Sequence, residues 1–183
     1  MRWIAVLLYV AAIYLTIPYA QHLWAAARAF AGVSFSSLAF YPLAATGGVV
    51  LVAAIYRTRA DAIALIGLAA LGSVYYYLYG HVFQAPAEKL HLLEYGLLSW
   101  IIWWAWRPGP NATSWAATGV WILNAAFGTA DELIQHYTPG RVGEVRDVMI
   151  NWESAALGLG VLMVMARPWR RKRGSTGSQS PEP

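Results

Sequence analysis

The chain has 183 residues, of which 58% are hydrophobic and only 12% are charged, whereas a soluble domain usually has about a quarter of its residues charged. The formal net charge of +4 does not indicate nucleic-acid binding, because much of the basic excess lies in residues 167–173, directly after an apolar segment. The absence of cysteine excludes disulfides, a thiolate nucleophile and Cys-ligated metal sites.

Apolar runs long enough to cross a bilayer, about 20 residues as helix, occur along the whole chain. They are expected at residues 3–19, 38–56, 62–79, 90–106, 115–137 and 148–166. The first run could instead be a cleaved signal peptide, but it is longer than the usual apolar region of such a peptide, and Pro18-Tyr19-Ala20 is a poor cleavage site. The second run contains Pro42 and Gly47-Gly48, so it could be re-entrant, which would leave four or five spans.

The sequence therefore predicts an all-α, polytopic membrane helical bundle of about six transmembrane helices. Residues 21–37 are expected to form an outer loop or a helix lying on the surface. Residues 167–183 are expected to be a basic, disordered cytoplasmic tail.

The basic residues predict the orientation of the bundle. If six helices alternate and the tail is cytoplasmic, the inner face carries the tail together with Arg2, Arg57, Arg59 and Arg107. The outer face then keeps the smaller set Arg28, Lys89, Arg141 and Arg146. Because positive residues concentrate on the cytoplasmic side, both termini are expected in the cytoplasm.

Polar residues gather in three of these runs at the end that this orientation places outside. In the fourth run Glu88, His91 and Tyr95 lie on one helical face, and Glu94 lies beside His91. The stripes of the fifth and sixth runs are Asn124, Gly128, Asp131 and Gln135, and Asp147, Asn151, Ser154 and Gly158. We expect the three helices to pack face to face around one polar pocket at the outer surface.

The segments "KLHLLEYG" and "DELIQHYTPGRVGEVRDVMIN", followed by "GLG", resemble the VanZ-like family of bacterial membrane proteins. The likeness covers residues 88–158, and one position departs from the family pattern, since Ser154 stands where a small glycine is usual. The family positions fall on Lys89, His91, Tyr95, Asp131, Glu132, Gln135, Pro139, Arg141, Asp147 and Asn151.

This resemblance divides the chain into three parts. Residues 1–87 are expected to be N-terminal transmembrane helices outside the family motif, residues 88–166 the VanZ-like core, and residues 167–183 the tail. The founding member of the family is associated with low-level resistance to the glycopeptide teicoplanin. The resemblance therefore implies a multi-pass protein of a bacterial inner or plasma membrane, with a role of the antibiotic-resistance type in the cell envelope.

Two sets of residues within the segment that resembles the VanZ-like family are expected to carry the function. The candidate catalytic residues are His91, as a general acid or base, and Asp131 and Glu132 as its carboxylate partners. Arg141 and Lys89 are expected to bind a phosphate or carboxylate head group. The full set of candidate substrate-binding residues is Lys89, Tyr95, Gln135, Arg141, Asp147 and Asn151.

Structural explanations compete with each of these roles. The charged residues could form an ion-pair and capping network, and capping of the last helix is the favoured interpretation for Asp147. His91-x-x-Glu94 and Glu132-x-x-x-His136 offer metal ligands, but the spacings are common and nearby basic residues compete, so no metal and no other cofactor are expected. Ser154 lacks the Gly-x-Ser-x-Gly motif of a nucleophile and is explained by helix packing.

Two classes of function remain open. The first is an envelope protein whose outer pocket binds or modifies an amphiphilic lipid, cell-wall or glycopeptide molecule. The second is a membrane-embedded hydrolase or transferase that acts on lipid-linked envelope substrates. The expected partners are membrane lipid and a lipid-linked or cell-wall ligand, with no nucleic acid, and the residues do not decide between binding and catalysis.

Overall fold

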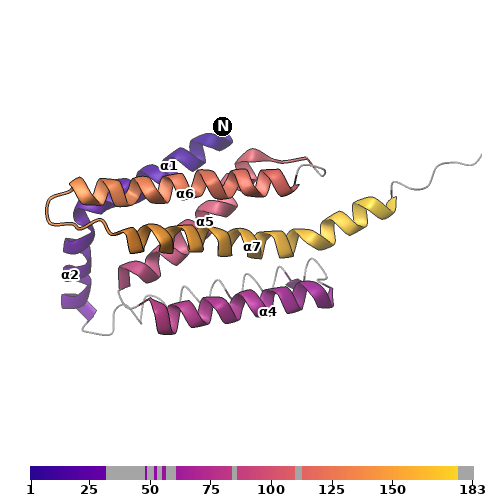
Figure 1. The fold of residues 1–183 in the computed structure, drawn as a ribbon, viewed down its shortest axis with the longest axis horizontal. Coiled ribbons are helices and arrows are strands. Elements are labelled where there is room, and N and C mark those ends of the chain that lie inside the picture. The colour runs from indigo at the N-terminus through magenta and orange to yellow at the C-terminus, as the bar shows by residue number, and fades with distance from the viewer. Residues whose placement is uncertain are drawn as a thin grey trace, which may run out of the picture.

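The computed structural model describes residues 1–31, 48, 52, 55–56, 61–83, 86–109 and 113–176, and the regular structure within these ranges is entirely helical (Figure 1). The elements are α1 (Arg2–Thr16), the 3-10 helix η1 (Ile17–Tyr19), α2 (Ala20–Ala31), α4 (Ala62–Tyr77), the π-helix η2 (Leu78–Val82), α5 (Pro86–Trp106), α6 (Thr113–Tyr137) and α7 (Val145–Thr176). The all-α prediction is therefore confirmed.

Three helical stretches in the described ranges are long and apolar enough to cross a membrane: Arg2–Tyr19, Ala62–Val82 and Val145–Met165. Helices α5 and α6 have 21 and 25 residues. At 1.5 Å per residue they are about 31 and 37 Å long, which is enough to cross the hydrocarbon core, but their polar residues make them less apolar. The second expected run, residues 38–56, lies almost entirely outside the described residues. The membrane bundle is confirmed, and the number of six spans stays a prediction.

Helix α5 lies at the centre of the bundle and packs against α1, α6 and α7, while α4 packs along α7 (Figure 1). Tyr95, Leu98 and Ile102 of α5 are fully buried, and their spacing places them on one face of the helix. Large apolar side chains remain exposed on the outer faces, including Leu8 of α1 and Ile66 of α4. Apolar outer faces of this kind are expected for helices that contact lipid.

Small residues allow α5, α6 and α7 to approach each other closely. A Cβ atom added at Gly158 of α7 would collide with the backbone of Gly96 in α5. A Cβ atom added at Gly128 of α6 would lie 2.7 Å from the Cβ of Asn151 in α7. Such close approach is typical of membrane helices, where backbone contact replaces the hydrophobic driving force.

The alternating topology predicts which helix ends lie together at each end of the bundle, and the described contacts agree with it. At one end the ring centroid of Trp106 lies 6.2 Å from that of Trp3 and 5.9 Å from that of Trp115. At the other end Arg146 at the start of α7 donates a hydrogen bond of 3.0 Å to the carbonyl of Val82. Which end faces the cytoplasm stays a prediction. Helix α7 continues to Thr176, past the expected start of the basic tail at residue 167.

Candidate functional site

His91, Asp131 and Glu132 lie together between α5 and α6, and we call these three residues the histidine–carboxylate cluster. All three are buried, with 7%, 1% and 3% of their surfaces exposed. His91 Nδ1 lies 3.9 Å from Asp131 Oδ2, and His91 Nε2 lies 3.9 Å from Glu132 Oε1. The sequence predicted that these residues share one site, and the geometry agrees, while their catalytic role stays a prediction.

Neighbouring groups hold the two carboxylates of the cluster in place. The hydroxyl of Tyr95 donates a 2.7 Å hydrogen bond to Asp131 Oδ2. Gln135 Nε2 donates to Glu132 Oε1 at 3.1 Å, and the backbone N–H of Glu144 donates to Glu132 Oε2 at 3.3 Å. Tyr95 and Gln135, two of the predicted binding residues, are thus contacts of the cluster itself. They fix the carboxylates before any ligand binds.

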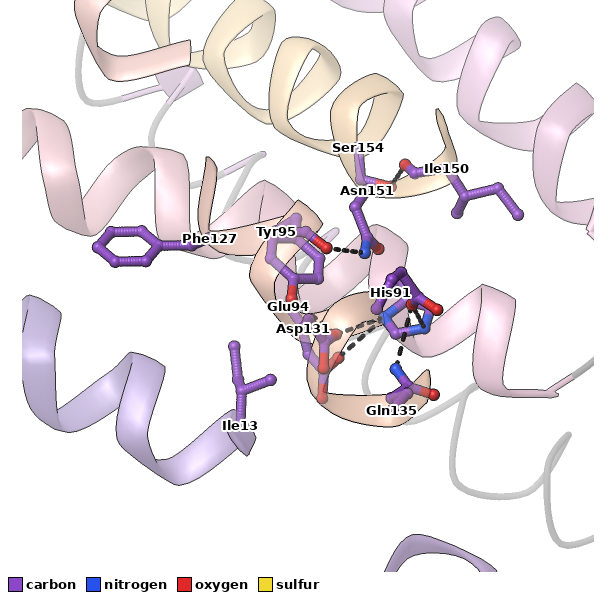
Figure 2. A network of polar contacts seen from close by, with 12 residues as sticks. Ile13, His91, Glu94, Tyr95, Phe127, Asp131, Gln135, Ile150, Asn151 and Ser154 are labelled. Carbon is purple, nitrogen blue, oxygen red and sulfur yellow. Dashed lines mark hydrogen bonds and ion pairs between the residues drawn. The ribbon is translucent and has the colours of Figure 1, made fainter. Parts of the chain in front are cut away.

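Glu94 is a third carboxylate beside the cluster, and the sequence placed it beside His91 without including it among the candidate catalytic or substrate-binding residues. Its Oε2 lies 3.4 Å from His91 Nδ1, and the side chains converge in Figure 2. Tyr9 of α1 donates a 3.2 Å hydrogen bond to the backbone carbonyl of Glu94, so the first helix supports this part of the site. The sequence could indicate this contact, because residues three positions apart, such as His91 and Glu94, are neighbours on a helix surface.

Two buried atoms of the cluster, His91 Nδ1 and Asp131 Oδ1, have no hydrogen-bond partner among the residues that the structure describes. A buried polar atom without a partner costs about 1–3 kcal/mol, and such atoms are uncommon in folded proteins. Asp131 Oδ1 can therefore accept a further partner, and the nearest carboxylate oxygen to His91 Nδ1 is Glu94 Oε2 at 3.4 Å.

Of the two predicted head-group residues, Arg141 lies at the edge of the cluster, whereas Lys89 contacts η2. Arg141 Nη2 donates a hydrogen bond to Oε1 of Gln135, which in turn contacts Glu132. Lys89 Nζ lies 4.4 Å from the centroid of the Tyr79 ring. Within the described ranges, the ion pairs of the Asp131 and Glu132 carboxylates are both with His91.

The structure places Asp147 and Asn151 differently. Asn151 is fully buried, and its Nδ2 donates a 3.0 Å hydrogen bond to the carbonyl of Gly128 in α6. Asp147 lies in the first turn of α7. The favoured interpretation of Asp147 as the capping residue is wrong, because α7 begins two residues earlier at Val145. A carboxylate in the first turn still interacts favourably with the positive end of the helix dipole.

Two other sequence interpretations are also decided by the geometry. His136, a possible metal ligand, is exposed, and its ring contacts Tyr137 at a centroid distance of 5.2 Å. Its proposed pairing with Glu132 is therefore replaced by a pairing of Glu132 with His91. The Ser154 hydroxyl donates a 2.6 Å hydrogen bond to the carbonyl of Ile150 in its own helix, which agrees with the packing explanation.

Arg146 pairs with Glu88, a contact that the sequence did not predict although both residues were expected at the outer surface. Arg146 Nη1 lies 2.5 Å from Glu88 Oε1, and the exposed fractions of the two side chains are 50% and 8%. This contact joins the first turns of α5 and α7 beside the cluster. No periodicity within one helix reveals it, because the two residues are 58 positions apart.

Comparisons with known proteins identify the family. No curated protein and no solved structure matches the chain. A family model described as VanZ/LLP1 matches residues 3–166 and therefore includes the N-terminal helices, which carry none of the motifs that first indicated the resemblance. Since this match covers most of the 183 residues, the chain belongs to the VanZ/LLP1 family.

Proposed function

We propose that this member of the VanZ/LLP1 family is a multi-pass protein of the bacterial cell membrane that binds or modifies an amphiphilic envelope molecule. The histidine–carboxylate cluster, at the end of the bundle expected to face outward, contacts the polar part of that molecule. The observation that carries the proposal is the burial of His91, Asp131 and Glu132 between α5 and α6, in a bundle where three of the described helical stretches are apolar enough to cross a membrane. Ionisable residues at such positions are costly in a membrane and generally mark a functional site.

The surroundings of the cluster favour a ligand that has both an anionic head and an apolar tail. Arg141, at the edge of the cluster, and Lys89, in the first turn of α5, are both partly exposed, so a phosphate or carboxylate can reach them. The guanidinium of Arg141 has a planar fork that suits two-pronged binding to such groups. The apolar outer faces of the helices suit an acyl or prenyl chain. A lipid, a lipid-linked cell-wall precursor and a lipoglycopeptide such as teicoplanin all combine these features.

A membrane-embedded hydrolase or transferase is the second candidate. It is favoured by the position of the His91 imidazole, which lies 3.4 Å from Glu94, 3.9 Å from Asp131 and 3.9 Å from Glu132. Carboxylates that orient an imidazole and stabilise its protonated form are a common arrangement for general acid–base catalysis. In this version His91 would move a proton to or from the ester or phosphate linkage of a lipid-linked envelope substrate.

Purified full-length protein in lipid nanodiscs distinguishes these functions. A fluorescent lipid-linked cell-wall precursor and labelled teicoplanin are incubated separately with the protein, and both bound ligand and reaction products are measured over time. Saturable binding without a product supports the binding function, and time-dependent formation of a product supports the enzyme. If neither probe binds or reacts, the proposal is wrong.

Substitutions connect either result to the cluster. Asp131→Asn and Glu132→Gln keep the size of each side chain but remove its charge, and both should abolish binding or turnover. His136→Gln, an exposed change on the same helix, is the matched control and should behave like the parent. Susceptibility to teicoplanin in cells that express each variant tests the resistance role.

A further inference from the structure

We propose that the histidine–carboxylate cluster is a binding site for one divalent transition-metal cation, such as Zn²⁺ or Mn²⁺, with His91, Asp131 and Glu132 as its ligands. The potential ligand atoms, one from each side chain, lie within 4.8 Å of one another. This cation site adds a component to the proposed function. It rests on that function in one respect only, namely that an anionic envelope ligand binds beside the cation. Cation binding itself is measurable without that ligand.

The separations within the cluster are close to those around a single ion. Nitrogen and oxygen ligands bind zinc at about 2.0–2.2 Å, almost always in a tetrahedral arrangement, so two ligands of one ion are about 3.3–3.6 Å apart. His91 Nε2 and Glu132 Oε1 are 3.9 Å apart, and the three ligand atoms lie within 4.8 Å of one another, so a modest contraction of the side chains brings them to one ion. Asp131 and Glu132 are consecutive near the end of α6, and His91 faces them from α5, so the ligands come from two rigid helices.

The two nitrogens of His91 would have different tasks. With Nε2 on the cation, Nδ1 faces the Glu94 carboxylate at 3.4 Å (Figure 2). Metal-binding histidines commonly donate their second ring N–H to a carboxylate, which fixes the tautomer and the ring orientation. Glu94 is thus a positioning residue for the ligand. Tyr95 has the same role for Asp131, because it occupies Oδ2 with a 2.7 Å hydrogen bond.

The unpartnered atom of Asp131 provides independent support. Asp131 is 1% exposed, and its Oδ1 has no hydrogen-bond partner in the described part of the chain. The two oxygens of this carboxylate therefore differ, since Oδ2 accepts a hydrogen bond from Tyr95 while Oδ1 accepts none from the described residues. A buried carboxylate oxygen of this kind is a good ligand for a hard or borderline cation.

The charge of the site also favours a cation. Asp131, Glu132 and Glu94 provide three carboxylates around one imidazole. The basic side chains that the sequence suggested as competitors have other contacts, Arg141 with Gln135 and Lys89 with the Tyr79 ring. Buried negative charge is costly unless a positive charge compensates it, and a divalent cation supplies that compensation.

The ligand set indicates the class of cation. Magnesium and calcium prefer sites made only of oxygen, whereas imidazole with carboxylates suits zinc and manganese. Three protein ligands leave at least one coordination position for a further group. In the proposed function, an oxygen of the phosphate or carboxylate head group takes that position.

The test uses full-length, tag-free protein purified in detergent and treated with EDTA. Zn²⁺ or Mn²⁺ is added, the protein is desalted, and bound metal is measured by elemental analysis and by isothermal titration. We expect about one cation per chain. His91→Ala, Asp131→Asn and Glu132→Gln should each lower affinity at least tenfold, as is usual when a metal site loses a ligand or its support. His136→Gln and Glu88→Gln are controls and should bind as the parent does.

A direct measurement on the parent protein covers the case in which a variant fails to fold. Pulsed electron paramagnetic resonance of the Mn²⁺-loaded protein should show coupling to one imidazole nitrogen. Less than a tenth of an equivalent of bound metal, no nitrogen coupling, or unchanged affinity in folded His91→Ala protein would each overturn the inference.

Binding of the lipid-linked precursor, measured with and without the cation, separates this inference from the proposed function. Precursor binding by protein that takes up no metal supports the function and overturns the cation site. Metal uptake by protein that binds neither the precursor nor teicoplanin supports the cation site and overturns the function.

Discussion

Tyr95→Phe removes a single buried hydroxyl group and tests the contact on which the geometry of Asp131 depends. Tyr95 is fully buried, and its hydroxyl donates a 2.7 Å hydrogen bond to Asp131 Oδ2. A hydrogen bond to a charged group contributes about 1.5–3 kcal/mol to the free energy of unfolding. For a protein of this size, 1 kcal/mol shifts Tm by about 2–4 °C. Tyr95→Phe should therefore lower Tm by about 3–12 °C.

Tyr14→Phe is the matched control, because Tyr14 donates a 2.8 Å hydrogen bond to a neutral acceptor, the backbone carbonyl of Phe127. A neutral hydrogen bond contributes about 0.5–1.5 kcal/mol, so this loss of Tm should be about half as large. The melting temperatures are measured in one detergent. If Tyr95→Phe lowers Tm no more than Tyr14→Phe does, the position of Asp131 does not depend on Tyr95, and the proposed role of this hydrogen bond is wrong.

Three further predictions concern packing, recognition and orientation. Gly158→Ala should destabilise the protein by about 1–3 kcal/mol in denaturant unfolding, because its Cβ collides with the α5 backbone, whereas Gly72→Ala meets no atom within 4 Å and should be neutral or stabilising. Arg141→Lys should leave Tm within about 2 °C of the parent but lower precursor binding at least tenfold, because lysine keeps the charge and loses the planar fork; equal binding would exclude two-pronged recognition. In this cysteine-free chain, Val142→Cys should react with an impermeant thiol reagent on intact cells and Gly109→Cys only after permeabilisation; the reverse pattern would invert the proposed orientation.

Most of the described helices could be predicted from hydropathy, and their ends show where hydropathy is insufficient. The fourth apolar run was expected to begin at residue 90, yet α5 begins at Pro86, where proline is favoured in a first helical turn because its missing N–H has no partner to lose. The sixth run was expected to end at residue 166, yet α7 continues to Thr176. Arginine and lysine are good helix formers, so a loss of hydropathy need not end a helix.

The sequence predicted which site residues share a face of one helix, but it did not predict all of the contacts between helices. Spacing along the chain placed His91 and Tyr95 on one face and Asp131 and Gln135 on another, and packing brings these faces together. Periodicity does not specify how far one helix slides along its neighbour. For this reason the sequence paired Glu132 with His136 in its own helix, whereas the structure pairs it with His91 of α5. The contact between Glu88 and Arg146 depends on the same inter-helix register.

That register is set by the small residues around the site, which connects the packing of the bundle to its chemistry. Gly128 lies one turn before Asp131, and its lack of a Cβ allows Asn151 of α7 to reach the Gly128 carbonyl at 3.0 Å. Gly158 allows α7 to meet α5 at the backbone of Gly96. Helix α7 therefore fixes the position of both α5 and α6, and with it the 3.9 Å separations inside the cluster. A cation or a head group that bound there would depend on this spacing, since metal–ligand distances tolerate changes of only about 0.2 Å. The polar stripe of α7, which contributes no residue to the cluster, is in this account the support that holds its two halves in register.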